Sequence, residues 1–262
     1  MNVSLPIIAY GGMCHADFSM ALARLYIEAL NKGVYSFSSS AISFESLISR
    51  GRNAAAACAL STNADYLMFI DTDIAFNPED VFKLLSHDKD VVCGTYPKKY
   101  INNDKVDFFF DNFHKLSDPS AVKKGNWRNL CTDPSTEITD LAISQYHKGD
   151  KLLEVNYAAT GFMLIKTKVF KKIIEVKPEI KYNNDIDGYH SYGDNFYDFF
   201  PVQINPSSKK YESEDYGFCK LWRSLGGKIY IDPTIKLGHL GKYLYSTDLQ
   251  KQFNMFTPNH GK

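Results

Sequence analysis

A continuous apolar run that ends in two acids constrains this chain more than any other feature. Residues 66–70 read Tyr-Leu-Met-Phe-Ile, and Asp71 and Asp73 follow directly. A strand without polar alternation suits a sheet that is covered on both faces, which is typical of parallel α/β sheets. Ligands bind at the carboxyl ends of the strands in such sheets. We therefore expect both carboxylates to face a binding site.

Strand and helix patterns alternate through the first part of the chain. Besides residues 66–70, the predicted strands are residues 3–10, 34–42 and 91–94, and the predicted helices are residues 16–30, 45–61 and a segment that begins at Asn77-Pro78. Strands that alternate with helices indicate βαβ units and a parallel sheet. We expect an α/β fold with a mixed, mainly parallel central sheet flanked by helices.

The later part of the chain is less regular. Its predicted elements are strands at 155–158, 162–166 and 228–232, helices at 167–176 and 214–225, and a turn at 238–241. We expect residues 100–150 to leave the sheet and residues 177–211 to form a long loop rich in polar and aromatic side chains. No linker divides the chain, so we expect one domain over residues 1–262.

The charge balance argues against a nucleic-acid-binding face. The chain carries 30 Lys and Arg against 30 Asp and Glu, a net charge of zero. Proteins that bind nucleic acid usually show a basic face. We therefore do not expect a nucleic-acid partner, although a local basic patch stays open as an alternative.

The cysteines and the apolar segments indicate a cytoplasmic protein. The five cysteines include no CxxC pair, so neither a zinc knuckle nor a thioredoxin motif is expected. An odd number of widely spaced cysteines suits a reducing compartment. The sequence shows no secretory signal and no transmembrane segment, which would need roughly 20 apolar residues. We expect a protein that is at most peripheral to a membrane-associated pathway.

Asp71 and Asp73 suit a divalent metal ion. Mg²⁺ and Mn²⁺ prefer oxygen ligands and often bind through one or two carboxylates plus substrate phosphates. The alternative is that aspartates at a strand end cap a helix or form a turn, which is the commoner case for an isolated pair. The apolar strand before them and the residues described next favour the metal site.

Glu214 and Asp215 begin a predicted helix after the long loop. Acids stabilise a helix N-terminus, which explains them without any chemistry. A carboxylate within hydrogen-bonding reach of a substrate hydroxyl can instead act as a general base. We treat both acids as candidate catalytic residues.

A histidine and an arginine segment complete the candidates. His239 lies between Gly238 and Gly241, which let the backbone turn sharply. Imidazole is a good ligand for Mn²⁺, although a lone histidine is more often a surface residue. Arg52 and Asn53 precede the metal strand, and guanidinium groups bind phosphates. A solvated basic turn is the alternative for that segment.

Three segments together resemble the GT-A glycosyltransferases. They are residues 46–81, 158–170 and 211–241. The resemblance is closest to the family 2-like enzymes found in bacteria, large DNA viruses and phages. It implies a Rossmann-like GT-A fold in a single domain, with a nucleotide-sugar-binding half at 1–100 fused to an acceptor-binding half at 101–262.

The resemblance also implies roles for individual residues. Asp71 and Asp73 would hold Mn²⁺ or Mg²⁺ on the donor diphosphate, and His239 would complete the metal site from the C-terminal loop. Asp215 matches the catalytic base of inverting members, with Glu214 beside it. The other donor-side candidates are Ala9 and Tyr10 as the nucleobase wall, Arg52, Asn53, Thr72 and Gly161 as donor contacts, and Lys242 over the diphosphate.

The implied activity is metal-dependent transfer of a sugar from a nucleotide-diphosphate sugar to a hydroxyl of a glycan or glycoconjugate, with inversion. UDP is the expected nucleotide, but residues 34–42 lack the acid typical of the family, so the base stays open. In the long loop we expect a lid and acceptor platform that includes Tyr189, Tyr192 and Tyr197. A hydrophobic cluster beneath the loop is the alternative.

Three other function classes stay open. A sugar-nucleotide nucleotidyltransferase would need a basic glycine-rich loop after the first strand, but Gly11-Gly12 has no lysine or arginine beside it. A glycosyltransferase that acts on hydroxymethylated DNA bases would need a basic acceptor face, for which the lysine pairs at 98–99, 123–124 and 209–210 are candidates. A non-catalytic carbohydrate-binding protein would use the aromatic residues without needing the acids.

Overall fold

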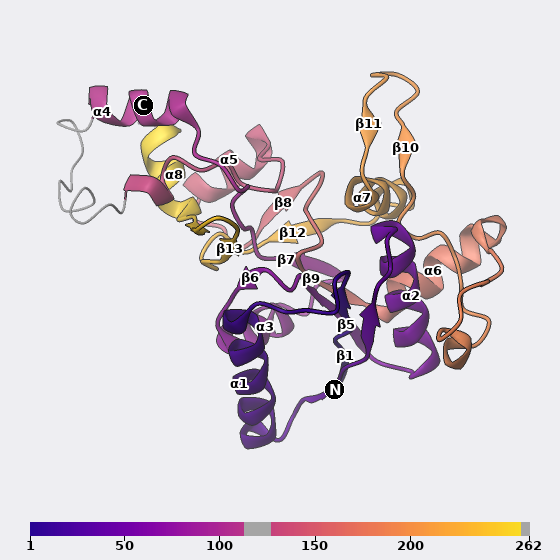
Figure 1. Cartoon of the computed structure of the whole chain (residues 1–262). Coiled ribbons are helices and arrows are strands. Elements are labelled where there is room, and N and C mark those ends of the chain that lie inside the picture. Colours follow the sequence, from indigo (N-terminus) through magenta and orange to yellow (C-terminus); the bar gives the residue numbers. More distant parts are fainter. Residues whose placement is uncertain (113–126, 258–262) are drawn as a thin grey trace.

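The structure is a computed structural model that describes residues 1–112 and 127–257. A seven-stranded sheet lies at its centre, in the order β3-β1-β5-β9-β7-β12-β8 (Figure 1). Its strands are β1 (Asn2–Ser4), β3 (Ser36–Ser38), β5 (Tyr66–Ile70), β7 (Val91–Cys93), β8 (Leu153–Val155), β9 (Phe162–Lys166) and β12 (Ile229–Ile231).

Most strands of this sheet run in one direction. β1 pairs in parallel with β3 and β5, and β12 pairs in parallel with β7. β9 is antiparallel to β5 and β7, and β8 is antiparallel to β12. Only β8 and β9 therefore oppose the other strands. The predicted α/β architecture with a mixed, mainly parallel sheet is confirmed.

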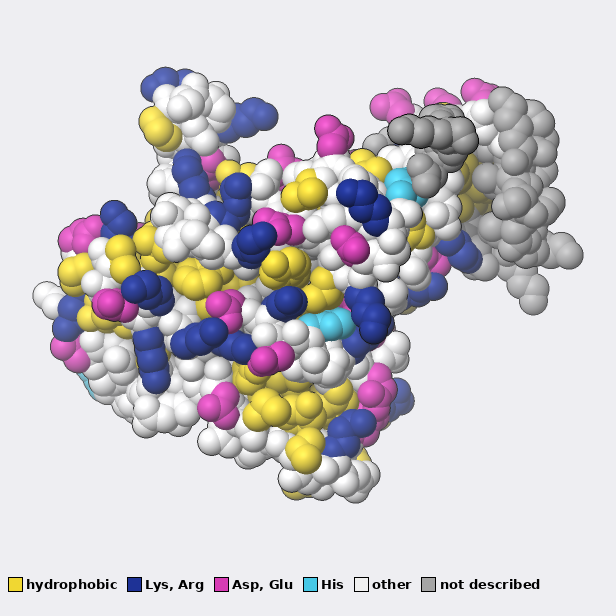
Figure 2. All heavy atoms as spheres, turned by 180° about the vertical axis from the view of Figure 1, so that it is seen from behind, with side chains coloured by type: hydrophobic (Ala, Val, Ile, Leu, Met, Phe, Trp, Pro, Cys, Tyr) yellow, Lys and Arg dark blue, Asp and Glu magenta, His cyan; other side chains and the backbone are white. Residues whose placement is uncertain are grey.

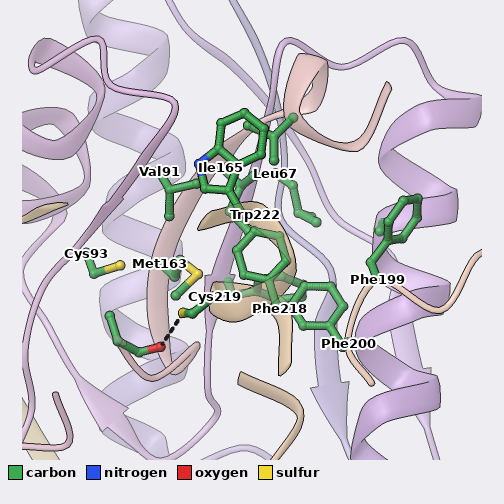
Figure 3. Close-up of a cluster of buried hydrophobic side chains, with 14 of the residues drawn as sticks. Leu67, Val91, Cys93, Met163, Ile165, Phe199, Phe200, Phe218, Cys219 and Trp222 are labelled. Carbon is green, nitrogen blue, oxygen red and sulfur yellow. Dashed lines mark hydrogen bonds between the residues drawn. The ribbon is translucent and has the colours of Figure 1, made fainter. Parts of the chain in front are cut away.

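The continuous apolar run of β5 is explained by burial on both faces. Successive side chains of a strand point to opposite faces. Leu67 and Phe69 join one buried cluster, whereas Tyr66, Met68 and Ile70 join the other. Figure 3 shows part of the first cluster, where phenylalanines and Trp222 pack against the sheet.

Helices cover both faces of the sheet. α1 (Ala16–Lys32) and α3 (Pro78–Ser86) contribute to the cluster that contains Met68. α2 (Ile48–Ser61), α6 (Thr167–Val176) and α7 (Glu214–Ser224) contribute to the cluster that contains Phe69. In Figure 1 the two sets of helices lie on opposite sides of the sheet.

The predicted helix ends near α1 and α3 are confirmed in detail. α1 ends at Gly33, whose φ of 66° is the left-handed conformation that glycine adopts without steric cost. α3 begins after Asn77, which forms a capping box with Asp80, and Pro78 occupies the first turn.

Two predicted strands are divided in the structure. Residues 3–10 form β1 and then β2 (Ile7–Ala9), and residues 34–42 form β3 and then β4 (Ala41–Ser43). The main-chain N–H groups of Leu5 and Ile7 donate to Ser38 and Ser40, on either side of Pro6. Proline has no N–H to donate, so the ladder is interrupted there. β2 and β4 form a separate parallel pair that extends toward the candidate site.

The predicted turn at 238–241 is wrong, because residues Gly238–Leu240 form the strand β13. β13 lies between β6 (Ile74–Ala75) and β14 (Leu244–Ser246) in a three-stranded antiparallel sheet. A Cβ atom on Gly238 would lie 2.6 Å from the Leu244 side chain. The glycine is therefore needed for close strand packing rather than for a turn.

The described parts of residues 100–150 lie outside the central sheet, as predicted. α4 (Asn103–Asn112), α5 (Asp140–His147) and α8 (Leu249–Phe256) lie together on one side of the molecule (Figure 1). The predicted strand at 155–158 is shifted and lies at β8. Among residues 1–112 and 127–257, no helix is long and apolar enough to cross a membrane.

The predicted loop at 177–211 contains local structure. It has two short 3-10 turns, Pro178–Ile180 and His190–Tyr192. β10 (Gln203–Ile204) and β11 (Tyr211–Glu212) then form a hairpin that projects from the molecule next to α7 (Figure 1).

Candidate active site

An open pocket of about 330 Å³ lies where β2, β4 and β5 end. It is lined by Ile8, Tyr10, Glu45, Ser46, Ile48, Arg52, Asp71, Thr72, Asp73 and Glu214. Segments that are far apart in the sequence therefore meet here, including the first turn of α7. Six of the predicted site residues line this pocket, namely Tyr10, Arg52, Asp71, Thr72, Asp73 and Glu214.

Asp71 is paired with a buried arginine. Nη2 of Arg52, on α2, lies 2.6 Å from Oδ1 of Asp71. The Arg52 side chain is only 3% exposed and lies over the ring of Phe69. Burial alone would lower the pKa of Arg52, but the ion pair with Asp71 outweighs it and raises the pKa above its usual value. Arg52 is therefore a fixed positive charge beneath the pocket.

One atom of Arg52 is left without a partner. Among the described residues, nothing accepts a hydrogen bond from Nε of this buried side chain. A buried donor without an acceptor costs free energy. Because Arg52 lines the pocket, its positive charge would attract an anionic ligand there, although Nε itself is buried.

Asp73 lies between a lysine and a histidine. Its Oδ2 atom is 2.5 Å from Nζ of Lys99 and 3.4 Å from Nε2 of His239. β13 places the histidine there, because His239 pairs with Ile74, the residue after Asp73. Nδ1 of His239 lies 2.8 Å from the carbonyl oxygen of Pro97, and the ring of Tyr96 packs edge-on against the imidazole.

These neighbours keep the Asp73 carboxylate ionised. Burial alone would raise the pKa of Asp73. Hydrogen bonds and charge from His239 and Lys99 outweigh burial and lower the pKa of Asp73 to about 2. A carboxylate with such a pKa carries its negative charge at every physiological pH.

The structure brings two of the three predicted metal ligands together. Asp73 and His239 converge, whereas the nearest cation to Asp71 is Arg52. Over residues 1–112 and 127–257, no group of three or more His, Cys, Asp or Glu residues could hold a metal ion by itself. The pair Asp73 and His239 still fits Mn²⁺ or Mg²⁺, because such ions commonly take their remaining ligands from phosphates and water.

Glu214 and Asp215 have different surroundings at the start of α7. Glu214 lines the pocket, and burial, followed by the charge of Asp215, raises the pKa of Glu214, although Arg52 opposes this. Asp215 is not among the pocket-lining residues. Its Oδ1 atom accepts hydrogen bonds from the hydroxyl of Ser213 and from the N–H of Tyr216. Of the two carboxylates, Glu214 therefore lies in the pocket and Asp215 lies outside its lining.

The exposed Tyr10 lines the pocket, and the exposed Phe44 lies beside it, outside the lining. Tyr10, predicted as part of the nucleobase wall, is 69% exposed, whereas Ala9 before it is buried. Phe44 is 76% exposed and was not predicted as a site residue. Its φ of 62° is rare for a residue with a bulky side chain. Its N–H donates to the carbonyl oxygen of Tyr10, and its ring lies close over Gly12.

Glu45 lines the pocket and is not among the site residues predicted from the sequence. Both of its carboxylate oxygens accept bonds of 2.8 Å from Arg50, and one also accepts from the N–H of Leu47. Burial would raise the pKa of Glu45, but these bonds lower it overall. Glu45 therefore places an ionised carboxylate just after β4, whereas residues 34–42 contain no acid.

Lys99 contacts the pocket residue Asp73 and was not among the predicted site residues. It belongs to a lysine pair that we considered only as part of a basic acceptor face. In the structure its ammonium group binds Asp73 instead. Nothing in the local sequence signals this contact, because the two residues come from different connections of the sheet.

Besides Ala9, three predicted donor contacts lie outside the pocket lining. Asn53 is buried and bonds to Asp198 and to the N–H of Phe200. Gly161 allows the hydroxyl of Tyr96 to approach, since a Cβ at this position would lie 2.5 Å from that oxygen. Lys242 is exposed at the turn between β13 and β14. A donor-binding role for these residues stays a prediction.

The loop tyrosines pack largely into the protein. Tyr189 is 8% exposed, stacks on Tyr192, and its hydroxyl lies 3.5 Å from Glu45. Tyr192 and Tyr197 pack against the buried cluster that contains Phe199. The alternative of a hydrophobic cluster beneath the loop describes these contacts, and a role in acceptor binding stays a prediction.

Charges of both signs are interspersed on the face shown in Figure 2. Of the lysine pairs considered for a basic face, Lys209 and Lys210 are exposed near the tip of the β10–β11 hairpin. The pair at 123–124 lies outside the described residues. The scattered arrangement does not strengthen the alternative of a DNA acceptor.

Comparison with known proteins gives no family for this chain. No protein-family model matches it, and no curated protein matches it significantly. The function proposed below is therefore argued from the geometry of the pocket.

Proposed function

We propose that this protein is a metal-dependent glycosyltransferase. It would transfer a sugar from a nucleotide-diphosphate sugar, with UDP as the first candidate nucleotide, to a hydroxyl of a glycan or glycoconjugate. The observation that carries the proposal is the convergence of Asp73, His239 and Arg52 at one pocket with exposed aromatic rings in it and beside it. Such a pocket offers complementary groups to a metal ion, a diphosphate and a flat base.

The donor side of the pocket would bind the nucleotide-diphosphate. Asp73 and His239 would hold Mn²⁺ or Mg²⁺, which supplies Lewis-acid stabilisation of the charge that develops on the leaving diphosphate. Arg52 would place a fixed positive charge beneath the phosphates, while Asp71 keeps the guanidinium in place. Tyr10 in the pocket lining and Phe44 beside it are exposed, so a nucleobase could stack there.

The acceptor side would use one of the acids of α7. We assign the general base to Asp215, which would take the proton of the acceptor hydroxyl as that oxygen attacks the anomeric carbon. Ser213 and the N–H of Tyr216 fix the orientation of its carboxylate. Attack from the face opposite the leaving diphosphate gives inversion. Glu214 would remain on the donor side, where it lines the pocket.

Nucleotide titration tests this function directly. We expect the protein to bind UDP, GDP or dTDP sugars in the presence of Mn²⁺, with a clear preference for one base, and to release the nucleoside diphosphate when an acceptor is added. A preference for nucleoside triphosphates would favour a nucleotidyltransferase instead. Carbohydrate binding without any nucleotide binding would contradict the proposal.

A further inference from the structure

Two side chains, Lys99 and His239, lie next to the same oxygen of Asp73, where a metal ion would bind. Oδ2 lies 2.5 Å from the ammonium nitrogen of Lys99 and 3.4 Å from Nε2 of His239. Lys99 follows closely on Pro97, whose carbonyl oxygen orients the His239 ring. The same short segment after β7 therefore supplies the cation on Asp73 and the group that orients the histidine.

We propose that Lys99 is an internal counter-ion that occupies the cation position at Asp73 in the free protein and moves to the donor diphosphate when the metal ion binds. This inference rests on the proposed function, because the diphosphate is part of that function. It assigns to Lys99 a phosphate-binding role that the sequence did not indicate.

The two cations cannot share the oxygen of Asp73 at close range. An ammonium group at hydrogen-bonding distance occupies the space in which a metal ion would bind the same oxygen. The two positive charges would also repel each other strongly at this separation, in a pocket that is partly shielded from water. A metal ion bound by Nε2 of His239 and by Oδ2 of Asp73 therefore requires Lys99 to leave that oxygen.

The Lys99 side chain has room to change its position, whereas the Arg52 side chain is held in place. The Lys99 side chain is 38% exposed, and its stem passes over Gly241, where the missing side chain leaves room. A lysine ammonium is a compact charge on a flexible stem. Arg52 is 3% exposed and is held by Asp71 and the ring of Phe69. The pocket thus combines a fixed cation with a displaceable one.

If Lys99 is displaced in this way, loss of its charge should change the metal affinity and the donor affinity in opposite directions. Removal of the Lys99 charge should strengthen metal binding to the free protein, because the competing cation is gone. The same change should weaken donor binding once metal is present, because the diphosphate loses a charged partner. A lysine with a merely structural role would not separate the two affinities in this way.

The test compares Lys99→Met with wild type and with Lys98→Met, in which the neighbouring exposed lysine is replaced and the net charge is equal. Mn²⁺ binding to the nucleotide-free proteins is measured by electron paramagnetic resonance of the free ion. We expect Lys99→Met to bind Mn²⁺ about tenfold more tightly than wild type. Lys98→Met should match wild type.

A second titration, with UDP-glucose as the probe or with the nucleotide sugar that wild type prefers, is made at saturating Mn²⁺. We expect Lys99→Met to bind the donor about tenfold more weakly than Lys98→Met. Thermal unfolding of each variant confirms that equal amounts of folded protein are compared.

The outcomes separate the inference from the proposed function. Equal Mn²⁺ affinity in wild type and Lys99→Met overturns the inference while leaving the metal site intact. Tighter Mn²⁺ binding with unchanged donor affinity overturns the transfer of Lys99 to the diphosphate. No Mn²⁺ binding in any of the proteins overturns the metal site of the proposed function, and the inference with it.

Discussion

His239 donates from Nδ1 to the carbonyl oxygen of Pro97, 2.8 Å away, and this bond decides which ring nitrogen faces Asp73. A carbonyl oxygen only accepts, so Nδ1 keeps its hydrogen, and Nε2, on the side of Asp73, is the nitrogen that can offer a lone pair to a metal ion when it carries no proton. Backbone partners of this kind commonly orient histidines that bind metal ions. The ring is therefore held in the form that can bind a metal through Nε2.

We expect His239→Ala to raise the Mn²⁺ concentration needed for half-maximal binding by at least about tenfold, because one ligand is lost. Excess Mn²⁺ should partly restore activity. Metal titrations of the two proteins check this, with His190→Ala as a control at an exposed position of the long loop. Identical midpoints for His239→Ala and wild type would remove His239 from the metal site.

Replacement of Asp73 should separate metal binding from folding. Asp73→Asn should abolish transfer and weaken nucleotide-diphosphate binding in Mn²⁺, because an amide is a poorer partner for a divalent ion than a carboxylate. The fold should persist, since the side chain lies at the edge of the pocket and is 27% exposed. Calorimetric titration and circular dichroism test the two parts. Equal nucleotide affinity in the two proteins would place the metal elsewhere.

The ionised state of Asp73 should also appear in acid unfolding. Its pKa is lowered to about 2 in the folded protein, so the stability that it contributes is present above its unfolded value and is lost as pH falls through the folded value. That window lies between about pH 4 and pH 2. We expect wild type to exceed Asp73→Asn by up to about 2 kcal/mol above the window and to lose this advantage within it. Urea unfolding at a series of pH values measures the difference; a constant difference contradicts it.

The two acids of α7 should respond differently to neutralisation. Asp215→Asn should remove turnover and keep donor affinity, because the base acts on the acceptor. Glu214→Gln should tighten donor binding, because it removes a negative charge from the pocket that we propose to bind the diphosphate. Donor titrations and steady-state rates of both variants decide between the roles. A large loss of donor affinity in Asp215→Asn would move that residue to the donor side.

Phe44 should show an unusual order of stabilities on substitution. At an ordinary position, substitution by alanine normally reduces the free energy of unfolding less than substitution by glycine. The φ of 62° at Phe44 favours glycine instead. We expect Phe44→Gly to be more stable than Phe44→Ala by about 1 kcal/mol. Both should bind nucleotide equally weakly, since both lose the ring. Chemical unfolding and nucleotide titration provide the test, and a more stable alanine variant would rule out the expected backbone strain.

Much of the architecture could be predicted because local chemistry and tertiary structure agree. The run at 66–70 is β5 with the predicted bounds, and the helix at 167–176 is α6. Asn77 and Gly33 mark helix ends through conformations that depend on a few adjacent residues. Such signals depend on local backbone preferences, which act in the same way wherever the segment lies in the fold.

The remaining features depend on pairings between distant segments. Gly238 was interpreted as a turn residue, because glycine favours turns as well as close strand packing, and only β6 and β14 decide between them. Likewise, the ion pair between Lys99 and Asp73 exists because two different connections meet at the same sheet edge. The composition of the pocket was therefore predicted better than its internal contacts.

The position of β13 between β6 and β14 bears on the order in which this pocket can form during synthesis. Asp73 and Arg52 are synthesised before β7, β9 and β12 of the central sheet. His239 follows only after those strands, and β13 must then insert beside β6. A nascent chain would thus contain Asp73 and Arg52 long before the complete pocket could form.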